Sequence, residues 1–379
     1  MLPAVGRYLK WIGAPAIVCA LGLACVLAVQ SGDAPGDLAD LTAATKTVCV
    51  GRFLIDVPEA ARVTMKMANL DGFDVTRQEE TAKQFEQWLA ERESTLGAAP
   101  NMLGRKNIEL SKELGEPGVS GKVLVHTRYR SYDMRNGQRV YHETVTVEGH
   151  VHKNGVTFSF SSDGDAPERA AVVSSLMRQL VLVRQGDIPQ APGFCLDNGL
   201  ITDPSLRERH ESVTMFAGFP GHPDISLAFW TNTGLHRGPG LVARDAAATD
   251  ARTLARSRTL RTGARTIGGF VGEEIGIETT ELNLTTNLSF AWETNGSQDK
   301  VLMPRLLLEL DTGLSPRTGG KPVSSSLKEE SAMQLWDSIS SSVRLRPTAI
   351  TGLARLDARG RPPATCTGAA MHRPAACRP

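Results

Sequence analysis

Residues 49–58 read Cys-Val-Gly-Arg-Phe-Leu-Ile-Asp-Val-Pro, and residues 195–204 read Cys-Leu-Asp-Asn-Gly-Leu-Ile-Thr-Asp-Pro. Cysteine, Leu-Ile and proline fall at the same offsets in both stretches. Each stretch opens a segment of about 150 residues, the usual size of one domain. The segments also end alike, with Val-Leu-Val-Arg at 181–184 and Val-Arg-Leu-Arg at 343–346. The sequence therefore predicts two similar domains, each starting with a strand that carries a cysteine.

The composition is that of a folded protein without a dominant charge. The chain has 379 residues, enough for two hydrophobic cores, and 41% of them are apolar. The formal net charge is +1, so no global field attracts nucleic acid or anionic lipid. Aromatic residues make up 5% of the chain, which argues against a site that stacks sugars or bases.

The N-terminus has the layout of an export signal. Arg7 and Lys10 precede an uncharged apolar run over residues 11–29, and a small polar stretch follows. We therefore expect segment 1–31 to be an export signal or membrane anchor, and 32–47 to be a linker.

Three kinds of processing fit this segment. Cleavage after Ala28 would release the protein, and an uncleaved run would span the bilayer once. Cys25 after Leu23-Ala24 resembles a bacterial lipoprotein site, although Gly22 stands where that pattern has leucine. We expect the protein to be tethered to a membrane, with these routes left open.

Export makes a disulfide between cysteines possible. Cys49 and Cys195 would lie in an oxidising compartment, where disulfides persist. Their matched positions favour a Cys49–Cys195 bridge, and the alternative is two buried free thiols. Cys366 and Cys377 could pair with each other or remain free.

The expected organisation is α+β, with two similar domains that each combine an antiparallel meander sheet with packed helices. The domains span 48–185 and 195–346, joined by a Pro- and Gly-rich linker at 186–194, and 347–379 is a disordered tail. Alternation and turn residues predict strands at 48–55, 122–130, 140–152, 156–161, 213–218, 225–231, 270–278, 286–294 and 301–311.

Capping signals and apolar periodicity predict the helices. Thr76 to Glu79 reads as a capping box before a helix with Phe85, Trp88, Leu89 and Leu96 on one face. Further helices are expected from Asp165 to about Arg184, from Thr249 to Arg256, and behind a box at Ser326 to Glu329.

The chain shows no motif for catalysis. There is no Gly-x-Ser-x-Gly elbow, and Gly319-Gly320-Lys321 is followed by proline where a phosphate loop needs Ser or Thr. His150 and His152 share a strand face, and His126 or His142 could join them around zinc. A polar sheet face, which also holds Thr144, Thr146 and Glu148, explains these histidines better, so we expect neither a metal site nor a cofactor.

A recognition surface is better supported. The hairpin around Asn136-Gly137 concentrates Arg130, Tyr132, Arg135 and Arg139 at its tip. Tyrosine and arginine are enriched where proteins bind each other, although a solvated hairpin would also carry such residues. These four residues are our candidates for partner binding.

The chain resembles the immunity proteins that protect bacteria against type VI secretion lipase effectors, specifically the class-four lipase immunity family with N- and C-terminal domains. The resemblance covers about residues 46–346 and rests on matching stretches at 49–58, 122–130, 193–197, 213–216, 221–224, 272–274, 290–296, 319–327 and 335–339.

The resemblance implies a non-enzymatic inhibitor. Such proteins bind a cognate phospholipase in the periplasm, and their two domains act as a pincer that occludes it sterically. No nucleic acid is expected as a partner, and the membrane is expected only through the N-terminal segment. The alternative is a periplasmic ligand-binding protein or metal-dependent enzyme that uses the interdomain cleft.

Overall fold

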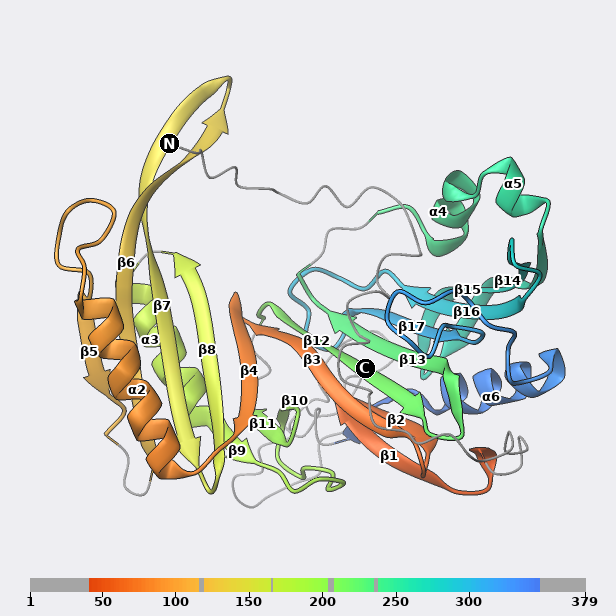
Figure 1. Ribbon diagram of the computed structural model, residues 1–379, viewed down its shortest axis with the longest axis horizontal. Coiled ribbons are helices and arrows are strands. Elements are labelled where there is room, and N and C mark those ends of the chain that lie inside the picture. The colour runs from red at the N-terminus through yellow and green to blue at the C-terminus, as the bar shows by residue number, and fades with distance from the viewer. Residues whose placement is uncertain (1–40, 116–118, 165, 204–207, 235–237, 348–379) are drawn as a thin grey trace, which may run out of the picture.

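The computed structural model describes most of the chain (Figure 1), namely residues 41–347 apart from 116–118, 165, 204–207 and 235–237. The predicted export segment, most of the predicted linker 32–47, Asp165 and the predicted tail beyond residue 347, with Cys366 and Cys377, lie outside the described residues. Within the described ranges, no helix has the length and apolar character needed to cross a membrane.

Each of the two matching stretches folds as a β-hairpin. The first comprises β1 (Thr45–Val50) and β2 (Phe53–Pro58), and the second comprises β10 (Gly193–Leu196) and β11 (Gly199–Thr202). Cys49 pairs with Leu54, and Cys195 pairs with Leu200. The offsets shared by the two sequences are therefore those of the same hairpin register.

The prediction of one strand from Val48 to Ile55 is wrong, because the chain reverses at Gly51 and Arg52. Gly51 has a φ of +58°, and a Cβ built there would lie 2.9 Å from side-chain atoms of Phe194 and Thr231. Glycine adopts this φ at no steric cost. Buried apolar residues lie on both sides of Gly51 and Arg52, so the hydrophobic pattern did not reveal the turn between the two strands.

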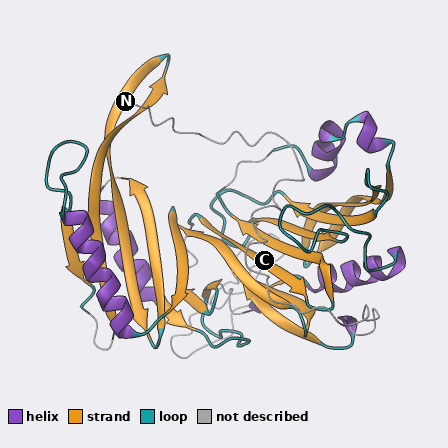
Figure 2. Cartoon of the chain, viewed as in Figure 1, coloured by secondary structure: helices purple, strands orange, loops and turns teal. Residues whose placement is uncertain are grey.

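Strands dominate the fold (Figure 2). The large sheet contains β3 (Arg62–Leu70), β4 (Phe73–Glu79), β5 (Leu110–Glu113), β6 (Ser120–Arg135), β7 (Gln138–Lys153), β8 (Val156–Gly164), β12 (Glu211–Phe219), β13 (His222–Asn232), β14 (Ser257–Ile267), β15 (Phe270–Thr280), β16 (Thr286–Thr294) and β17 (Arg305–Asp311). Two small sheets add β9 (Leu180–Leu182) to β10 and β11, and β18 (Arg344–Leu345) to β1 and β2.

The two halves of the chain share the large sheet. Its order is β14-β15-β16-β17-β13-β12-β3-β4-β8-β7-β6-β5, and all neighbours are antiparallel. The predicted meanders form, but not as two separate sheets, because β3 from the N-terminal half pairs with β12 from the C-terminal half. This pairing makes the sheet one continuous platform.

Helices pack on both ends of the platform. α2 (Ala82–Gly97) and α3 (Ala166–Gln179) cover opposite faces of β6 to β8 (Figure 1). α6 (Glu329–Ser342) packs on β2, β14 and β16, where its Trp336 stacks on Phe290 with ring centroids 5.8 Å apart. α4 (Leu241–Ala248) and α5 (Ala251–Leu254) form a separate corner, which we call the helical corner.

Several helix boundaries differ from the predictions. Thr76 to Glu79 lies in β4, and the capping box that starts α2 is formed by Thr81 and Gln84. The helix after residue 165 ends at Gln179 rather than Arg184, because β9 then pairs with β11. The helix predicted at 249–256 is replaced by α4 and α5, and β14 begins at Ser257.

The capping box predicted at Ser326 is also absent. α6 starts after Lys328, which makes no side-chain cap. Ser326 is instead held by the start of β13, since its amide donates to Asp224 Oδ2 at 2.9 Å and its hydroxyl lies 2.8 Å from His222 Nδ1. A tertiary contact thus uses the side chain that the local pattern assigned to the helix.

Candidate partner-binding surface

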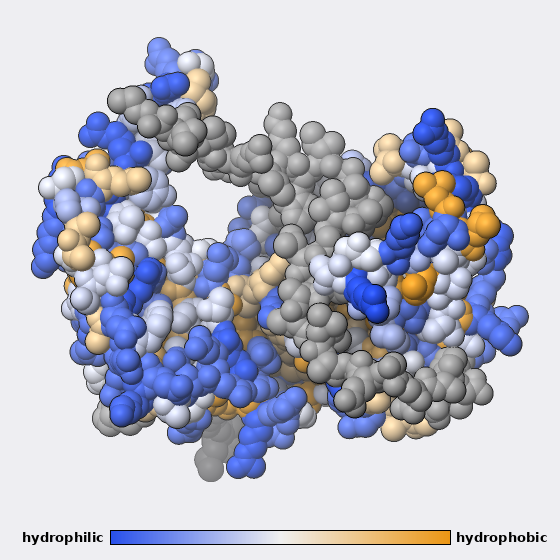
Figure 3. All heavy atoms as spheres, viewed as in Figure 1, coloured by the Kyte–Doolittle hydropathy of each residue, from blue (hydrophilic) through white to orange (hydrophobic). Residues whose placement is uncertain are grey.

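Two projections flank a hollow in the molecule. The hairpin of β6 and β7, which we call the hairpin arm, extends beyond the body on one side, and the helical corner rises on the other (Figure 1). The space-filling view shows an opening beside the hairpin arm (Figure 3). β3, β4 and β12 lie between the two projections (Figure 1).

The hairpin arm ends in a two-stranded ribbon. β5 pairs with β6 as far as Val125, and β8 pairs with β7 as far as Val145, so residues 129–144 pair with each other and with no other described strand. The turn at Asn136 and Gly137 has φ angles of 50° and 77°, as the Asn-Gly pair predicts. The ribbon therefore presents both of its faces to solvent.

Three of the four candidate residues share one face of the ribbon. Register places Arg130, Tyr132 and Arg139 on one face, and Arg135 on the opposite face. The Arg139 guanidinium lies 4.6 Å above the Tyr132 ring, and the Tyr141 ring is 5.7 Å from that ring. This stack forms an aromatic and cationic patch.

Sequence reasoning missed Tyr141. Its side chain is 57% exposed, and Met134 beside it is 61% exposed. The signal was available, because a two-residue turn at 136 and 137 pairs residue 132 with residue 141.

A groove lies where the two halves of the sheet meet. Its volume is about 440 Å³, and we call it the central groove. Met67 lies in it with a φ of 52° and a 62% exposed side chain, at the point where the register between β3 and β12 shifts. A bulge at this junction turns an apolar side chain outward. The groove is lined by Met67, Ala68, Asn69, Asp74, Val75, Thr76, His210, Ser212 and Asn232.

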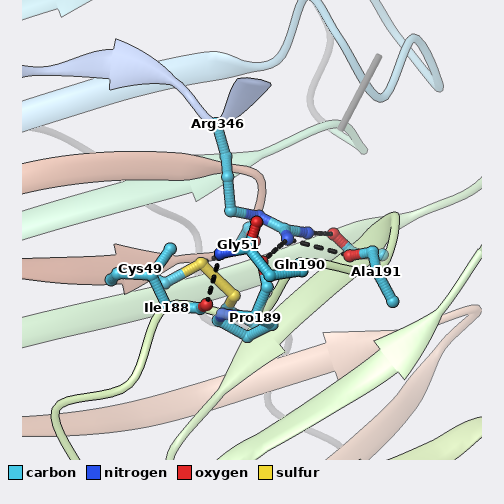
Figure 4. The surroundings of a disulfide bond; sticks show 9 residues. Cys49, Gly51, Ile188, Pro189, Gln190, Ala191 and Arg346 are labelled. Atoms are coloured by element: carbon cyan, nitrogen blue, oxygen red, sulfur yellow. Dashed lines mark hydrogen bonds between the residues drawn. A yellow bond between two sulfur atoms is a disulfide. The ribbon is translucent and has the colours of Figure 1, made fainter. Parts of the chain in front are cut away.

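A disulfide links the N-terminal and C-terminal halves through the hairpins β1–β2 and β10–β11, a region that we call the base of the molecule. Cys49 and Cys195 form a disulfide, as predicted, and their Cα atoms lie 5.9 Å apart (Figure 4). Gly51 and Cys195 exchange backbone hydrogen bonds of 2.8 and 3.1 Å beside it. Arg346 donates to the carbonyl oxygens of Pro189 and Ala191, so the end of the C-terminal half also holds the segment between the halves (Figure 4).

A buried ionic cluster reinforces the base. Arg52 donates to Glu211 Oε1 at 2.5 Å and to Asp203 Oδ2 at 2.7 Å, and its side chain is 1% exposed. Arg209 donates to Asp71 at 2.9 Å. Each pair joins a residue of the N-terminal half to one of the C-terminal half. The two halves are therefore held in one relative position by charge as well as by the disulfide.

The histidines that suggested zinc lie beneath α2. His152 stacks on Phe85, and His150 contacts Trp88 edge-on. Of the four histidines considered, His142 lies apart, on the hairpin arm, where Ser131 is 2.7 Å away. The polar-face interpretation fits this arrangement, and the described residues hold no group of three His, Cys, Asp or Glu side chains suited to a metal ion.

Glu148 is the centre of that polar face. Its carboxylate accepts hydrogen bonds from Arg92 at 2.5 Å and lies 3.1 Å from His150 Nε2 and 3.4 Å from His126 Nε2. Burial alone would raise the pKa of Glu148, but these histidine and arginine contacts hold it well below its ordinary range. The cluster therefore ties α2 to the sheet as a structural feature.

Two family models match the chain. The model for the Tle cognate immunity protein 4 N-terminal domain matches residues 46–175, and that for the Tle cognate immunity protein 4 C-terminal domain matches residues 187–348. No curated protein gives a significant sequence match.

Solved structures share the fold. The apo immunity protein TplEi of T6SS from Pseudomonas aeruginosa has a TM-score of 0.67 at 22% identity, covering 80% of this chain and 98% of that one. A chain of the Tle4-Tli4 complex has a TM-score of 0.68 at 22% identity, with the same coverage. TplEi complexed with "L" peptide has a TM-score of 0.64 at 21% identity, covering 80% and 99%. With both domain models matched in order, the chain belongs to the Tle cognate immunity protein 4 family.

Proposed function

We propose that this protein binds a cognate type VI secretion phospholipase and blocks it sterically, which protects the producing cell and its kin. The observation that carries the proposal is the hollow between the hairpin arm and the helical corner in a chain of this immunity family. A similar fold occurs in the Tle4-Tli4 complex, which supports a lipase as the partner.

The geometry suits a binding surface that is already formed before the lipase binds. The two projections would act as the arms of a pincer, and the central groove would contact the part of the lipase that enters between them. The aromatic and cationic patch of Tyr132, Arg139 and Tyr141 has the composition of an interface hot spot. Because the disulfide and the Arg52 cluster fix the base, little ordering free energy is spent on binding.

The proposed location is the periplasm, with the N-terminal segment as the membrane tether. The basic and apolar pattern of residues 1–31 supports export. The disulfide supports it independently, because such bonds persist in oxidising compartments and are rare in the cytosol.

Co-expression tests the proposal. A candidate type VI lipase, sought among the genes that neighbour the gene of this protein, is directed to the periplasm of a host cell, with and without this protein. We expect the lipase to lyse the cells and this protein to restore growth, while purified complex shows no phospholipid hydrolysis. Lysis that continues when both proteins accumulate in the periplasm would overturn the proposal. A catalytically inactive lipase serves as the control for toxicity unrelated to hydrolysis.

A further inference from the structure

Three exposed leucines gather at the outer end of the helical corner. Leu254 of α5 is 66% exposed, and Leu282 and Leu284, in the loop between β15 and β16, are 85% and 84% exposed. The Thr280 amide donates to the Arg256 carbonyl at 2.9 Å, which brings this loop beside the end of α5. We call these three residues the leucine patch, and Figure 3 shows apolar surface beside α4 and α5.

The loop that carries two of these leucines is rigid. The Asn283 side chain donates to the Pro322 carbonyl at 2.8 Å and accepts from the Thr285 hydroxyl at 2.7 Å. The Leu284 amide donates to the Glu281 carbonyl at 3.0 Å, which holds Leu284 at a φ of 66°. The positive φ of Leu284 costs backbone strain energy, and its exposure leaves an apolar side chain in water. Residues with both costs are candidates for a functional contact.

The composition of the patch favours lipid over protein. Leucine is under-represented among protein hot spots, which favour tyrosine, tryptophan and arginine, as at the tip of the hairpin arm. Leucine is instead among the side chains that enter a bilayer most favourably. The leucine patch and the tip of the hairpin arm therefore have different chemistry and suit different partners.

Basic residues border the patch. Arg252 and Arg256 lie on either side of Leu254 in the sequence, and exposed Lys321 precedes the proline that binds Asn283. Two acidic side chains lie nearby as well, Asp250, which accepts from the Thr253 amide, and Glu281, which accepts from Asn287, and the three basic residues outnumber them. Basic side chains around an apolar loop complement anionic phospholipid headgroups.

We propose that the leucine patch docks on an anionic bilayer surface. Leu254, Leu282 and Leu284 enter the interface, and Arg252, Arg256 and Lys321 contact the headgroups. This contact is too small to hold the protein on a membrane by itself, so it acts as a second attachment that orients a chain already brought to the bilayer. The leucine patch includes Leu254 of α5, a helix that lies farther from the hollow than α4 does (Figure 1). The membrane contact is therefore a property separate from the inhibition proposed above.

A local probe tests this contact in the full-length chain. An environment-sensitive fluorescent amino acid is placed at position 282 or, as the matched control, at position 271, where Val271 is 72% exposed at the opposite end of β15. Because the probe reports its own surroundings, the means by which the rest of the chain reaches the vesicle does not matter. The vesicles contain phosphatidylglycerol and a lipid with a quencher on its acyl chain.

We expect a blue shift and several-fold stronger quenching at position 282 than at position 271. Leu284→Asp should reduce the quenching at 282, and vesicles of phosphatidylcholine alone should weaken it. Equal quenching at the two positions, or none at 282, would overturn the proposal. A blue shift at 282 that needs the lipase and not the vesicles would also overturn it, and would assign the patch to a protein partner.

Discussion

Among single residues, Glu309 is expected to make stability depend on pH. It lies in β17, where burial raises its pKa to about 7 and the nearby Asp311 and Glu293 carboxylates act in the same direction, against Arg244. In the unfolded chain its pKa is near the reference value of 4.5. Folding therefore favours the protonated acid, and this contribution is complete below pH 4.5 and is lost as the pH rises through 7.

Glu309→Gln should remove this dependence. We expect the variant to match the native protein near pH 4 and to exceed its free energy of unfolding by about 2–3 kcal/mol at pH 8. Urea unfolding of both proteins at each pH provides the difference. A difference that stays constant from pH 4 to pH 8 would contradict the assignment of the titration to Glu309.

Arg52 is the residue whose loss should cost most at the base. Arg52→Met removes the buried cation that hydrogen-bonds to both Asp203 and Glu211, which we expect to lower the free energy of unfolding by about 3–5 kcal/mol. Arg77→Met is the matched control, because its partners Glu79 and Asp197 are 73% and 42% exposed and the expected loss is below about 1 kcal/mol. Similar losses in the two variants, measured by urea unfolding, would show that burial does not decide the effect.

At the scale of elements, the ribbon at the end of the hairpin arm should separate binding from stability. Tyr132→Ser with Tyr141→Ser removes two exposed rings that support no other strand in the described ranges. We expect a change of less than about 1 kcal/mol in stability and a loss of at least about 30-fold in affinity for the lipase. Calorimetry and surface plasmon resonance measure the two quantities.

The control for the ribbon is Met102→Ser, whose side chain is 79% exposed in the loop between α2 and β5. Unchanged affinity in the double variant would remove the ribbon from the interface. Lost stability together with lost affinity would mean that the rings support the arm rather than the partner.

Local patterns predicted the elements better than their boundaries. The Asn-Gly turn at 136 and 137 requires a positive φ at both residues, so that hairpin and its register follow from sequence alone. The spacing from Thr76 to Glu79 resembles a helix cap, yet these residues pair with β8. A capping signature cannot reveal a strand partner some eighty residues away, and tertiary pairing overrides it.

The central groove could not be predicted either, because it also depends on pairing between strands that are distant in the sequence. It exists because β3 meets β12, strands whose residues lie about 145 positions apart, and no periodicity encodes that pairing. The disulfide was predictable, since two matched stretches of sequence and an export signal brought Cys49 and Cys195 into one argument. Matched sequence therefore indicated a shared motif, while the way the two halves join came from the fold.

For the whole molecule, one continuous sheet implies one cooperative unit. β3 and β12 pair along most of their length, and the Arg52 cluster and the disulfide cross the same boundary. Separating the halves would expose the buried edges of both. We therefore expect the halves to unfold together even when the disulfide is absent, in contrast to two domains joined by a flexible linker.

Cys49→Ala with Cys195→Ala tests this expectation. The bond closes a loop spanning 146 positions, for which the chain-entropy model gives about 5 kcal/mol of stabilisation. We expect the variant to lose about 2–5 kcal/mol and still to unfold in one transition. Trp88 reports on the N-terminal half, and Trp292 and Trp336 report on the C-terminal half, so single-tryptophan versions of the variant give the unfolding midpoint of each half in urea.

The reduced native protein is the control, because it should reproduce the midpoint of the double variant if loss of the bond is the sole change. Coincident midpoints at the two tryptophan sites would establish that the shared sheet couples the halves. Separate midpoints would mean that the disulfide, rather than the β3–β12 pairing, holds the two arms as one body. In that case, reduction should also weaken inhibition of the lipase, since the arms would no longer be fixed around the hollow.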